Sequence, residues 1–130
     1  MHPSSILFVC LGNICRSPMA EGVFKKILFR EGIHQQFQVD SAGLIGYHQG
    51  ELADSRMRAH ASRREYNLTH RSRQVTKADF DKFDLIIGMD DQNIRGLNNI
   101  AQTPEQKAKI RRMTDFCVNM QATEVRDPYY

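Results

Sequence analysis

The sequence predicts an α/β fold in which helices flank a parallel β-sheet. Two runs of large apolar residues, Ile6 to Val9 and Phe83 to Met89, are typical of strands buried on both faces. Helical patterns lie between and after these runs, and such alternation in a small chain favours βαβ units with right-handed crossovers. We find no repeat, linker or low-complexity stretch, so the 130 residues are expected to form one domain with one core.

The first strand leads directly into a short polar loop. Cys10 follows where the strand would leave the sheet, and a Gly-Asn pair at 12–13 marks a tight turn. Ser17 suits an N-cap and Pro18 suits the first helical position, because the N–H that proline lacks is not needed there. The backbone amides before this helix would then be free to point inward and form a nest for an anion.

A helix is expected from Pro18 to about Glu31, with Gly32 as its stop. Five apolar residues form one stripe along it and should pack on the sheet: Ala20, Val23, Phe24, Ile27 and Leu28.

A second strand is indicated by Phe37 and Val39, which alternate with polar residues. We expect it to end in a polar turn at 40–43, followed by a glycine-rich loop at 44–50. If the first two strands are neighbours, this turn lies near the thiol loop.

Asp54 or Ser55 can cap a further helix that reaches about Tyr66. Its apolar face is thin and consists of Met57, Ala61 and Leu68. The segment 56–77 carries seven basic residues against the single acid Glu65, which is typical of a solvated face. No RNA-binding or zinc-finger motif accompanies these charges, so we expect no nucleic-acid partner.

The third strand, Phe83 to Met89, should be followed by a helix that Asp90 and Asp91 cap and that ends near Asn99. A magnesium site at this aspartate pair is poorly supported, because no further carboxylates cluster there. Residues 103–109 read as helical. A fourth strand within 110–118 contains Arg111 and Arg112, which indicates a weakly defined edge strand.

The spacing of Cys10 and Arg16 suits chemistry on a phosphate monoester. Five residues separate them, so a guanidinium can lie opposite the sulfur across the nest and offset the charge of a phosphate dianion without a metal. The same amides and guanidinium favour a thiolate, which makes Cys10 the expected nucleophile of a phosphocysteine intermediate. A nucleotide-binding loop is poorly supported, because no Gly-Lys-Ser/Thr sequence follows Gly12.

Composition is that of an ordinary soluble globule, with 41% hydrophobic and 25% charged residues and a net charge of +3. A mildly basic chain suits anionic substrates. The three cysteines, no signal-like leader and an apolar run of only 6–11 predict a cytoplasmic protein without a membrane partner. Neither the cysteines nor the five histidines have finger-like spacing, so we expect no metal and no cofactor.

The segment CLGNICRSP, residues 10–18, together with Asp-Pro-Tyr-Tyr at 127–130, resembles the low-molecular-weight protein tyrosine phosphatases. The resemblance extends over the entire chain, including the neighbourhoods of Ser41 and His70 and the pair Met89-Asp90. It implies four parallel strands in the flavodoxin-like order 2-1-3-4. In that order the Cys10 loop lies beside the switch point where doubly wound sheets bind ligands.

The resemblance also assigns roles along the chain. Asp127 would be the general acid and then the general base, and Asn13 would tie the loop to Ser41 and His70. Ser17 would donate its hydroxyl proton to the sulfur. The phosphate-binding loop would consist of Leu11, Gly12, Asn13, Ile14, Cys15, Arg16 and Ser17, and the substrate cleft would be lined by Tyr47, Tyr129 and Tyr130.

The expected substrates are phosphotyrosine proteins or small aryl phosphates, and a phosphate or sulfate ion would fit the loop. Three alternatives remain. A thiol-linked arsenate reductase needs further cysteines, and only Cys117 lies outside the loop. A related arginine phosphatase would have threonine in place of Ile14 and would differ in the aromatic ending at Tyr129. A non-enzymatic phosphate-binding module would not turn over p-nitrophenyl phosphate.

Two further expectations concern Cys15 and the end of the chain. Cys15 lies close enough to Cys10 for a disulfide that would protect the oxidised sulfur from further oxidation. The domain, residues 1–130, ends where the family normally continues into one more helix. We therefore expect an uncovered apolar face, and either a longer natural protein or a partner chain, such as a second copy in a dimer, that covers it.

Overall fold

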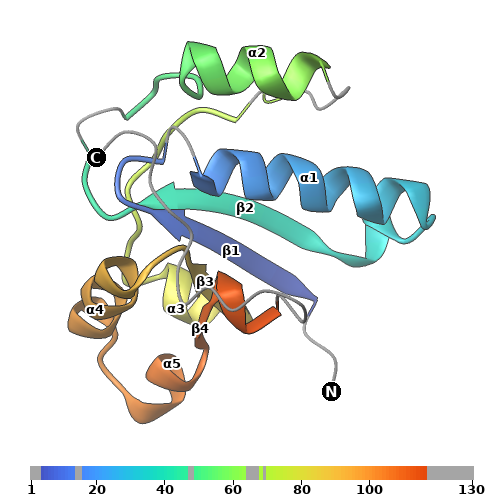
Figure 1. Cartoon of the computed structure of the whole chain (residues 1–130). Helices are drawn as coiled ribbons and strands as arrows, with labels where there is room; N and C mark the ends of the chain where they lie inside the picture. Colours follow the sequence, from blue (N-terminus) through green and yellow to red (C-terminus); the bar gives the residue numbers. More distant parts are fainter. Residues whose placement is uncertain (1–3, 14–15, 47–48, 64–67, 69, 117–130) are drawn as a thin grey trace.

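A computed structural model describes residues 4–13, 16–46, 49–63, 68 and 70–116. Four parallel strands form one sheet in the order β2-β1-β3-β4, as predicted (Figure 1). The strands are β1 (Ser5–Cys10), β2 (Gln38–Gly43), β3 (Leu85–Gly88) and β4 (Ile110–Arg112).

Five α-helices lie within the described ranges: α1 (Arg16–Arg30), α2 (Ser55–Arg63), α3 (Asp79–Lys82), α4 (Asp91–Ile100) and α5 (Pro104–Ala108). Two short 3₁₀ helices span His34–Gln36 and Met113–Phe116. No helix of the described ranges has the length and apolar character needed to cross a membrane.

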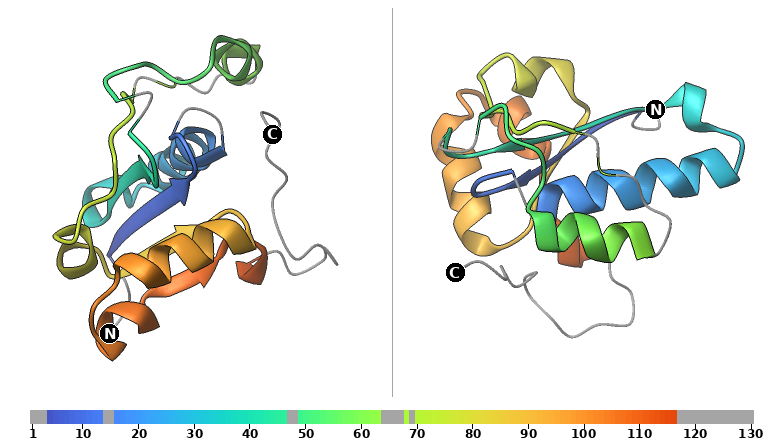
Figure 2. Two further views of the ribbon diagram at one scale, coloured as in Figure 1. Left: turned by 90° about the vertical axis from the view of Figure 1, so that its left-hand side faces the viewer. Right: turned by 90° about the horizontal axis from the view of Figure 1, so that it is seen from above.

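β1 is buried on both faces, because its alternating side chains enter two different cores. Leu7 and Val9 belong to a core with Phe80, Phe83 and Leu97. Phe80 lies in α3, Phe83 directly follows this helix, and Leu97 lies in α4. Ile6, Phe8 and Cys10 point to the other face, where Ala20 and Phe24 of α1 pack against them. On that side, α2 lies beside α1 and away from the sheet (Figure 2). The doubly buried strands that the apolar runs predict are thus present, with β3 shorter than the predicted range.

Several predicted ends of helices and strands agree with the structure. Gly32 ends the first helix in a left-handed conformation, with φ of 71°, and Ile33 N donates to Leu28 O at 3.0 Å. Asp90 caps α4 by accepting from Asn93 N at 2.8 Å. Thr103 begins α5 with a capping box. The fourth strand is a short edge strand in which Ile110 is buried and both arginines are exposed.

Two local predictions are wrong. Ser17 is not an N-cap, because α1 already includes Arg16 and Ser17 lies in its first turn. Residues 40–43 are not a turn but the second half of β2. They pair in parallel with residues 7–10 of β1, ending with Cys10 opposite Gly43. The neighbouring strand supplies the backbone partners, and this outweighs the turn preference of an Asp-Ser-Ala-Gly sequence.

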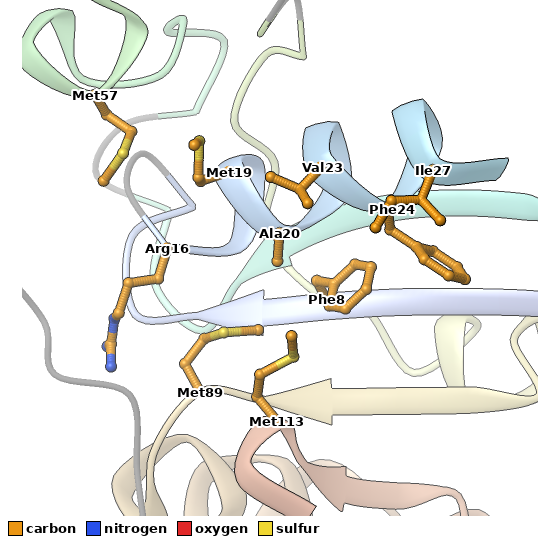
Figure 3. A pocket seen from close by; sticks show the side chains of 10 residues that line it. All are labelled: Phe8, Arg16, Met19, Ala20, Val23, Phe24, Ile27, Met57, Met89 and Met113. Atoms are coloured by element: carbon orange, nitrogen blue, oxygen red, sulfur yellow. The ribbon is translucent and has the colours of Figure 1, made fainter. Parts of the chain in front are cut away.

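The apolar stripe of α1 is only partly covered. Leu28 is buried and Phe24 packs on the sheet, whereas Ile27 is 45% exposed. Val23 and Ile27 instead border an apolar groove of about 500 Å³ on this face (Figure 3). The groove is lined by Phe8, Arg16, Met19, Ala20, Val23, Phe24, Ile27, Met57, Met89 and Met113.

Candidate functional site

The carboxyl end of β1 places a thiol at the floor of a tight loop. Cys10 is the last residue of the strand and is buried. The backbone N–H of Asn13 donates to Cys10 Sγ at 3.2 Å, and Ser17 Oγ lies 3.0 Å from the same sulfur. Asn13 has a φ of 59°, a left-handed conformation that asparagine tolerates better than most residues. The turn directs its amide toward the sulfur.

The hydroxyl of Ser17 is oriented by its second neighbour. Asn13 Nδ2 donates to Ser17 Oγ at 2.9 Å, so this oxygen already acts as an acceptor. Its single hydrogen is then available for Cys10 Sγ. The hydroxyl of Ser17 and the amide N–H of Asn13 are thus both directed at one sulfur atom.

The carboxamide of Asn13 connects the loop to two other parts of the chain. Its Nδ2 donates to Ser17 Oγ and to Ser41 Oγ, each at 2.9 Å. Its Oδ1 accepts the backbone N–H of Arg73 at 3.0 Å and lies 2.9 Å from His70 Nε2. Because a backbone N–H can only donate, the orientation of this amide is fixed, and His70 Nε2 must also be a donor.

The backbone of the loop is held from two sides. Ser72 Oγ donates to the carbonyl oxygen of Asn13 at 2.6 Å. Leu44 N donates to Cys10 O at 3.1 Å, and Ile45 N donates to Leu11 O at 3.0 Å. The loop therefore lies directly against the chain that leaves β2.

Gly43 allows this close approach. A Cβ at position 43 would lie 3.0 Å from Asn13 N, Gly12 C and Leu11 O, which are all backbone atoms of the loop. Backbone atoms cannot rotate away as a side chain can, so any larger residue would displace the loop.

Arg16 is buried and oriented by the end of β3. Its Nη1 donates to Asp90 Oδ2 at 2.9 Å. The other carboxylate oxygen of Asp90 caps α4 through Asn93 N. One carboxylate thus holds the guanidinium and starts a helix, and α4 is fixed relative to the loop.

Several charged side chains contact the residues that bind Asn13 and one another. Ser41 Oγ donates to Glu21 Oε1 at 2.6 Å. Arg73 donates to Asp40 Oδ2 and, through both terminal nitrogens, to Asp79, each at 3.0 Å. Burial acts to raise the pKa of Asp79, but hydrogen bonds from Arg73 and Thr76 outweigh it and lower that pKa. Burial likewise opposes the charge of Arg73, and its bonds to Asp79 and Asp40 raise its pKa.

The structure brings together six of the site residues predicted from the sequence: Cys10, Asn13, Arg16, Ser17, Ser41 and His70. Leu11 and Gly12 lie in the same loop. The remaining predictions fall outside the described residues: Ile14, Cys15, Tyr47, Cys117, Asp127, Tyr129 and Tyr130.

Sequence reasoning missed five residues of this network: Glu21, Asp40, Ser72, Arg73 and Asp90. Asp90 was interpreted as a helix cap, with a magnesium pair as a poorly supported alternative, and its contact with Arg16 was not predicted. A signal for its second role exists, because the carboxyl ends of parallel strands meet at one edge of a sheet and Asp90 follows β3 as the loop follows β1.

Comparisons with known proteins give one consistent family. The family model "Low molecular weight phosphotyrosine protein phosphatase" matches residues 5–130. The human protein of that name is 43% identical over 127 residues, which are 97% of this chain and 80% of the human one.

Two solved structures share the fold. A protein tyrosine phosphatase from Entamoeba histolytica, with Hepes in its active site, has a TM-score of 0.93 and 46% identity, and the match covers 98% of this chain and 81% of that one. Wzb from Vibrio vulnificus, in complex with benzylphosphonate, has a TM-score of 0.83 and 31% identity, with 98% and 83% covered. With a cysteine loop of this geometry, the chain belongs to the low-molecular-weight phosphotyrosine protein phosphatase family.

Proposed function

We propose that this chain hydrolyses phosphotyrosine through a phosphocysteine intermediate formed on Cys10. The observation that carries the proposal is the sulfur at the floor of the loop, which meets the amide of Asn13 at 3.2 Å and the hydroxyl of Ser17 at 3.0 Å. Arg16, fixed by Asp90, would clamp two phosphate oxygens from one side of the loop. Such an arrangement binds a dianion and leaves the phosphorus open to in-line attack.

The reaction would proceed in two displacements. In the first, the thiolate of Cys10 forms a bond to phosphorus, the bond from phosphorus to the tyrosine oxygen breaks, and Asp127 protonates the phenolate. In the second, Asp127 takes a proton from water, the water oxygen attacks phosphorus, and the sulfur leaves as a thiolate that Ser17 stabilises. The products are tyrosine and inorganic phosphate.

The substrate class rests on similarity. Benzylphosphonate, which the Vibrio vulnificus relative binds, resembles an aryl phosphate in joining an aromatic ring to a phosphorus dianion. Tyr47, Tyr129 and Tyr130 are proposed as the cleft that receives the phenyl ring, and they lie outside the described residues.

Cys10→Ser tests the nucleophile. A serine hydroxyl stays protonated and is a poor nucleophile, so turnover of p-nitrophenyl phosphate should vanish while inorganic phosphate still binds. A variant that retains more than a small residue of the wild-type kcat would exclude Cys10 from this role.

Asp127→Ala tests the general acid. Its kcat should fall more for phosphotyrosine than for aryl phosphates with acidic leaving groups, because only a basic phenolate must be protonated as it leaves. An equal loss across a series of aryl phosphates would remove Asp127 from the role.

The redox assignments are also proposals. The thiolate of Cys10 needs a reducing compartment, which suits the cytoplasm. Cys15 would form a disulfide with Cys10 after oxidation, so wild-type protein treated with peroxide should recover activity in dithiothreitol and Cys15→Ser should recover less. Equal recovery of the two proteins would leave Cys15 without this role.

A further inference from the structure

Three groups from three segments of the chain meet behind the loop, on the far side of Asn13 from the thiol. His70 Nδ1 lies 3.5 Å from Glu21 Oε1 and 3.3 Å from Asp40 Oδ1. One ligand atom from each of the three residues lies within 4.8 Å of the other two. Glu21 belongs to α1, Asp40 to β2, and His70 to the segment between α2 and α3.

The positions of the hydrogens on His70 determine which species can lie between the three side chains. The hydrogen on His70 Nε2 is directed at Asn13 Oδ1, an oxygen that also accepts from Arg73 N. Nδ1 therefore faces two carboxylate oxygens, which are acceptors only. A bare nitrogen lone pair opposite two anionic oxygens is repulsive, so a positive species must lie between them. That species is either a proton on Nδ1 or a metal cation.

The two carboxylate oxygens retain the capacity to bind a cation. Among the described residues, Glu21 Oε1 accepts one hydrogen bond, from Ser41 Oγ at 2.6 Å, and Asp40 Oδ1 accepts one, from Ser41 N at 2.8 Å. Each oxygen keeps a second lone pair. The outer oxygens are neutralised by Lys25 on Glu21 and by Arg73 on Asp40, and Arg73 is shared with Asp79. The carboxylates are thus held in place while each inner oxygen keeps its second lone pair.

The distances favour zinc. Tetrahedral zinc with bonds of about 2.0–2.1 Å separates neighbouring ligand atoms by about 3.3–3.4 Å, close to the two separations measured from His70 Nδ1. Magnesium and calcium prefer sites made only of oxygen atoms. A zinc-ligating imidazole also donates its other N–H to a carbonyl or carboxylate oxygen, as His70 does to Asn13 Oδ1.

We propose that Glu21, Asp40 and His70 form a binding site for Zn²⁺, in which the metal replaces a proton on His70 Nδ1 and water supplies a fourth ligand. The side chains of Glu21, His70 and Asp40 are 5%, 15% and 28% exposed, so the cluster is mostly buried and is exposed chiefly on the Asp40 side. The bound ion joins α1, β2 and the His70 segment, and leaves the bond from His70 Nε2 to Asn13 intact. Zinc at this site is a structural brace for the loop and takes no part in the proposed reaction.

The test measures zinc binding in the Cys10→Ser background, because the thiolate of Cys10 would itself bind zinc. Titration with ZnCl₂ should give one more equivalent for this variant than for the double variant with His70→Gln. Glutamine keeps a donor near the position of Nε2 and removes the Nδ1 ligand. Zinc should also raise the Tm of the Cys10→Ser variant by about 5 °C, a shift that MgCl₂ should not produce.

His60→Gln in the same background is the matched control, because His60 is an exposed histidine on α2. The His60→Gln variant should still bind the additional equivalent of zinc that the His70→Gln variant does not bind. If His70→Gln does not fold, Asp40→Asn replaces it, since asparagine keeps an oxygen for Ser41 N and lacks the charge that zinc requires. Equal binding by the Cys10→Ser variant and both cluster variants, or loss of the equivalent in His60→Gln, would overturn the proposal.

Discussion

Arg16 Nη1 lies 2.9 Å from Asp90 Oδ2, although 74 residues separate the two in the chain. Asp90→Asn should separate the two roles of this carboxylate, because asparagine caps a helix about as well as aspartate does but has no charge to hold the guanidinium. We expect kcat/KM for p-nitrophenyl phosphate to fall by about tenfold, since a hydrogen bond to a charged partner contributes about 1.5–3 kcal/mol. The Tm should fall as well, because the buried guanidinium loses its charged partner, so the kinetics are measured well below the Tm.

Asp91→Asn is the control for this effect. Asp91 pairs with Arg112 at 3.0 Å, and both side chains are more than 40% exposed, so the pair should contribute under about 1 kcal/mol. Its kcat/KM should stay within about twofold of wild type. Equal kinetic losses in the two variants would mean that general charge near the site, and not the contact with Arg16, sets the rate.

Ser17→Ala should slow the second displacement more than the first, because in the proposed mechanism the hydroxyl 3.0 Å from Cys10 Sγ stabilises the sulfur as it leaves phosphorus. We expect kcat to fall by about tenfold, the size of effect that one charge-assisted hydrogen bond gives, and the phosphocysteine to accumulate. Stopped-flow measurements with p-nitrophenyl phosphate should then show a larger burst of p-nitrophenol.

Ser5→Ala provides the comparison at the opposite end of β1. Ser5 Oγ donates to Lys82 O at 3.3 Å, far from the loop. This variant should lose some stability and keep wild-type burst kinetics. A Ser17→Ala protein with reduced kcat and no added burst would place the effect of Ser17 on the first displacement.

Gly43→Ala should abolish most of the activity. The added Cβ would lie 3.0 Å from three backbone atoms of the loop, including Asn13 N, and the loop must shift. A shift of this size costs about 1–3 kcal/mol of stability and displaces the amide that contacts Cys10 Sγ. We expect kcat/KM to fall by at least about tenfold.

Gly32→Ala should cost stability alone. Its φ of 71° is strained for alanine by about 1–2 kcal/mol, and nothing lies within 4 Å of the added Cβ. Steady-state kinetics below the unfolding temperature should match wild type. If Gly43→Ala behaved in the same way, the close approach to the loop would have no kinetic role.

Asp79→Asn should lower the free energy of unfolding by about 2 kcal/mol at pH 7, because the buried carboxylate accepts bonds from Arg73 and Thr76. The lowered pKa of Asp79 means that its stabilising effect is fully present above the unfolded value of about 3.9 and is lost as the pH falls through the folded value. The difference in the free energy of unfolding between Asp79→Asn and wild type should therefore become smaller below about pH 4.

Urea unfolding at several pH values between 7 and 3.5 measures this gap. Asp81→Asn is the control. Within the described residues, the side chain of Asp81 accepts one exposed hydrogen bond, from Gln106 Nε2 at 3.1 Å. The Asp81→Asn variant should stay within about 0.5 kcal/mol of wild type throughout. A gap for Asp79→Asn that stayed constant down to pH 3.5 would contradict the pKa argument.

The fold was predictable because apolar runs and helix signals act locally. The buried strands, the stop at Gly32 and the caps at Asp90 and Thr103 each depend on a few adjacent residues. The errors have two causes, which are a tertiary contact in one case and the shortness of a helix in another. Residues 40–43 have turn composition but find a strand partner in β1. The short helix Asp79–Lys82 has only four residues, too few for a periodic pattern.

The loop of the site was predictable for the same reason, since the strand end, the Gly-Asn turn and Arg16 lie within seven residues of Cys10. The supporting contacts were not predicted, although the resemblance implied the sheet order. Asp90 reaches Arg16 because β3 is the neighbour of β1, but the strand order alone does not show which side chain at a strand end makes the contact. The roles of Asp127 and the aromatic residues remain predictions.

The partners of Asn13 have a consequence for how the chain folds. Ser41 and His70 lie 28 and 57 residues further along the sequence, so their bonds to Asn13 form only after long loops have closed. The left-handed turn at Asn13 has little local stabilisation without them. A chain released from the ribosome would thus carry an inert thiol until its sheet has assembled, and catalysis would appear and disappear cooperatively with the tertiary structure.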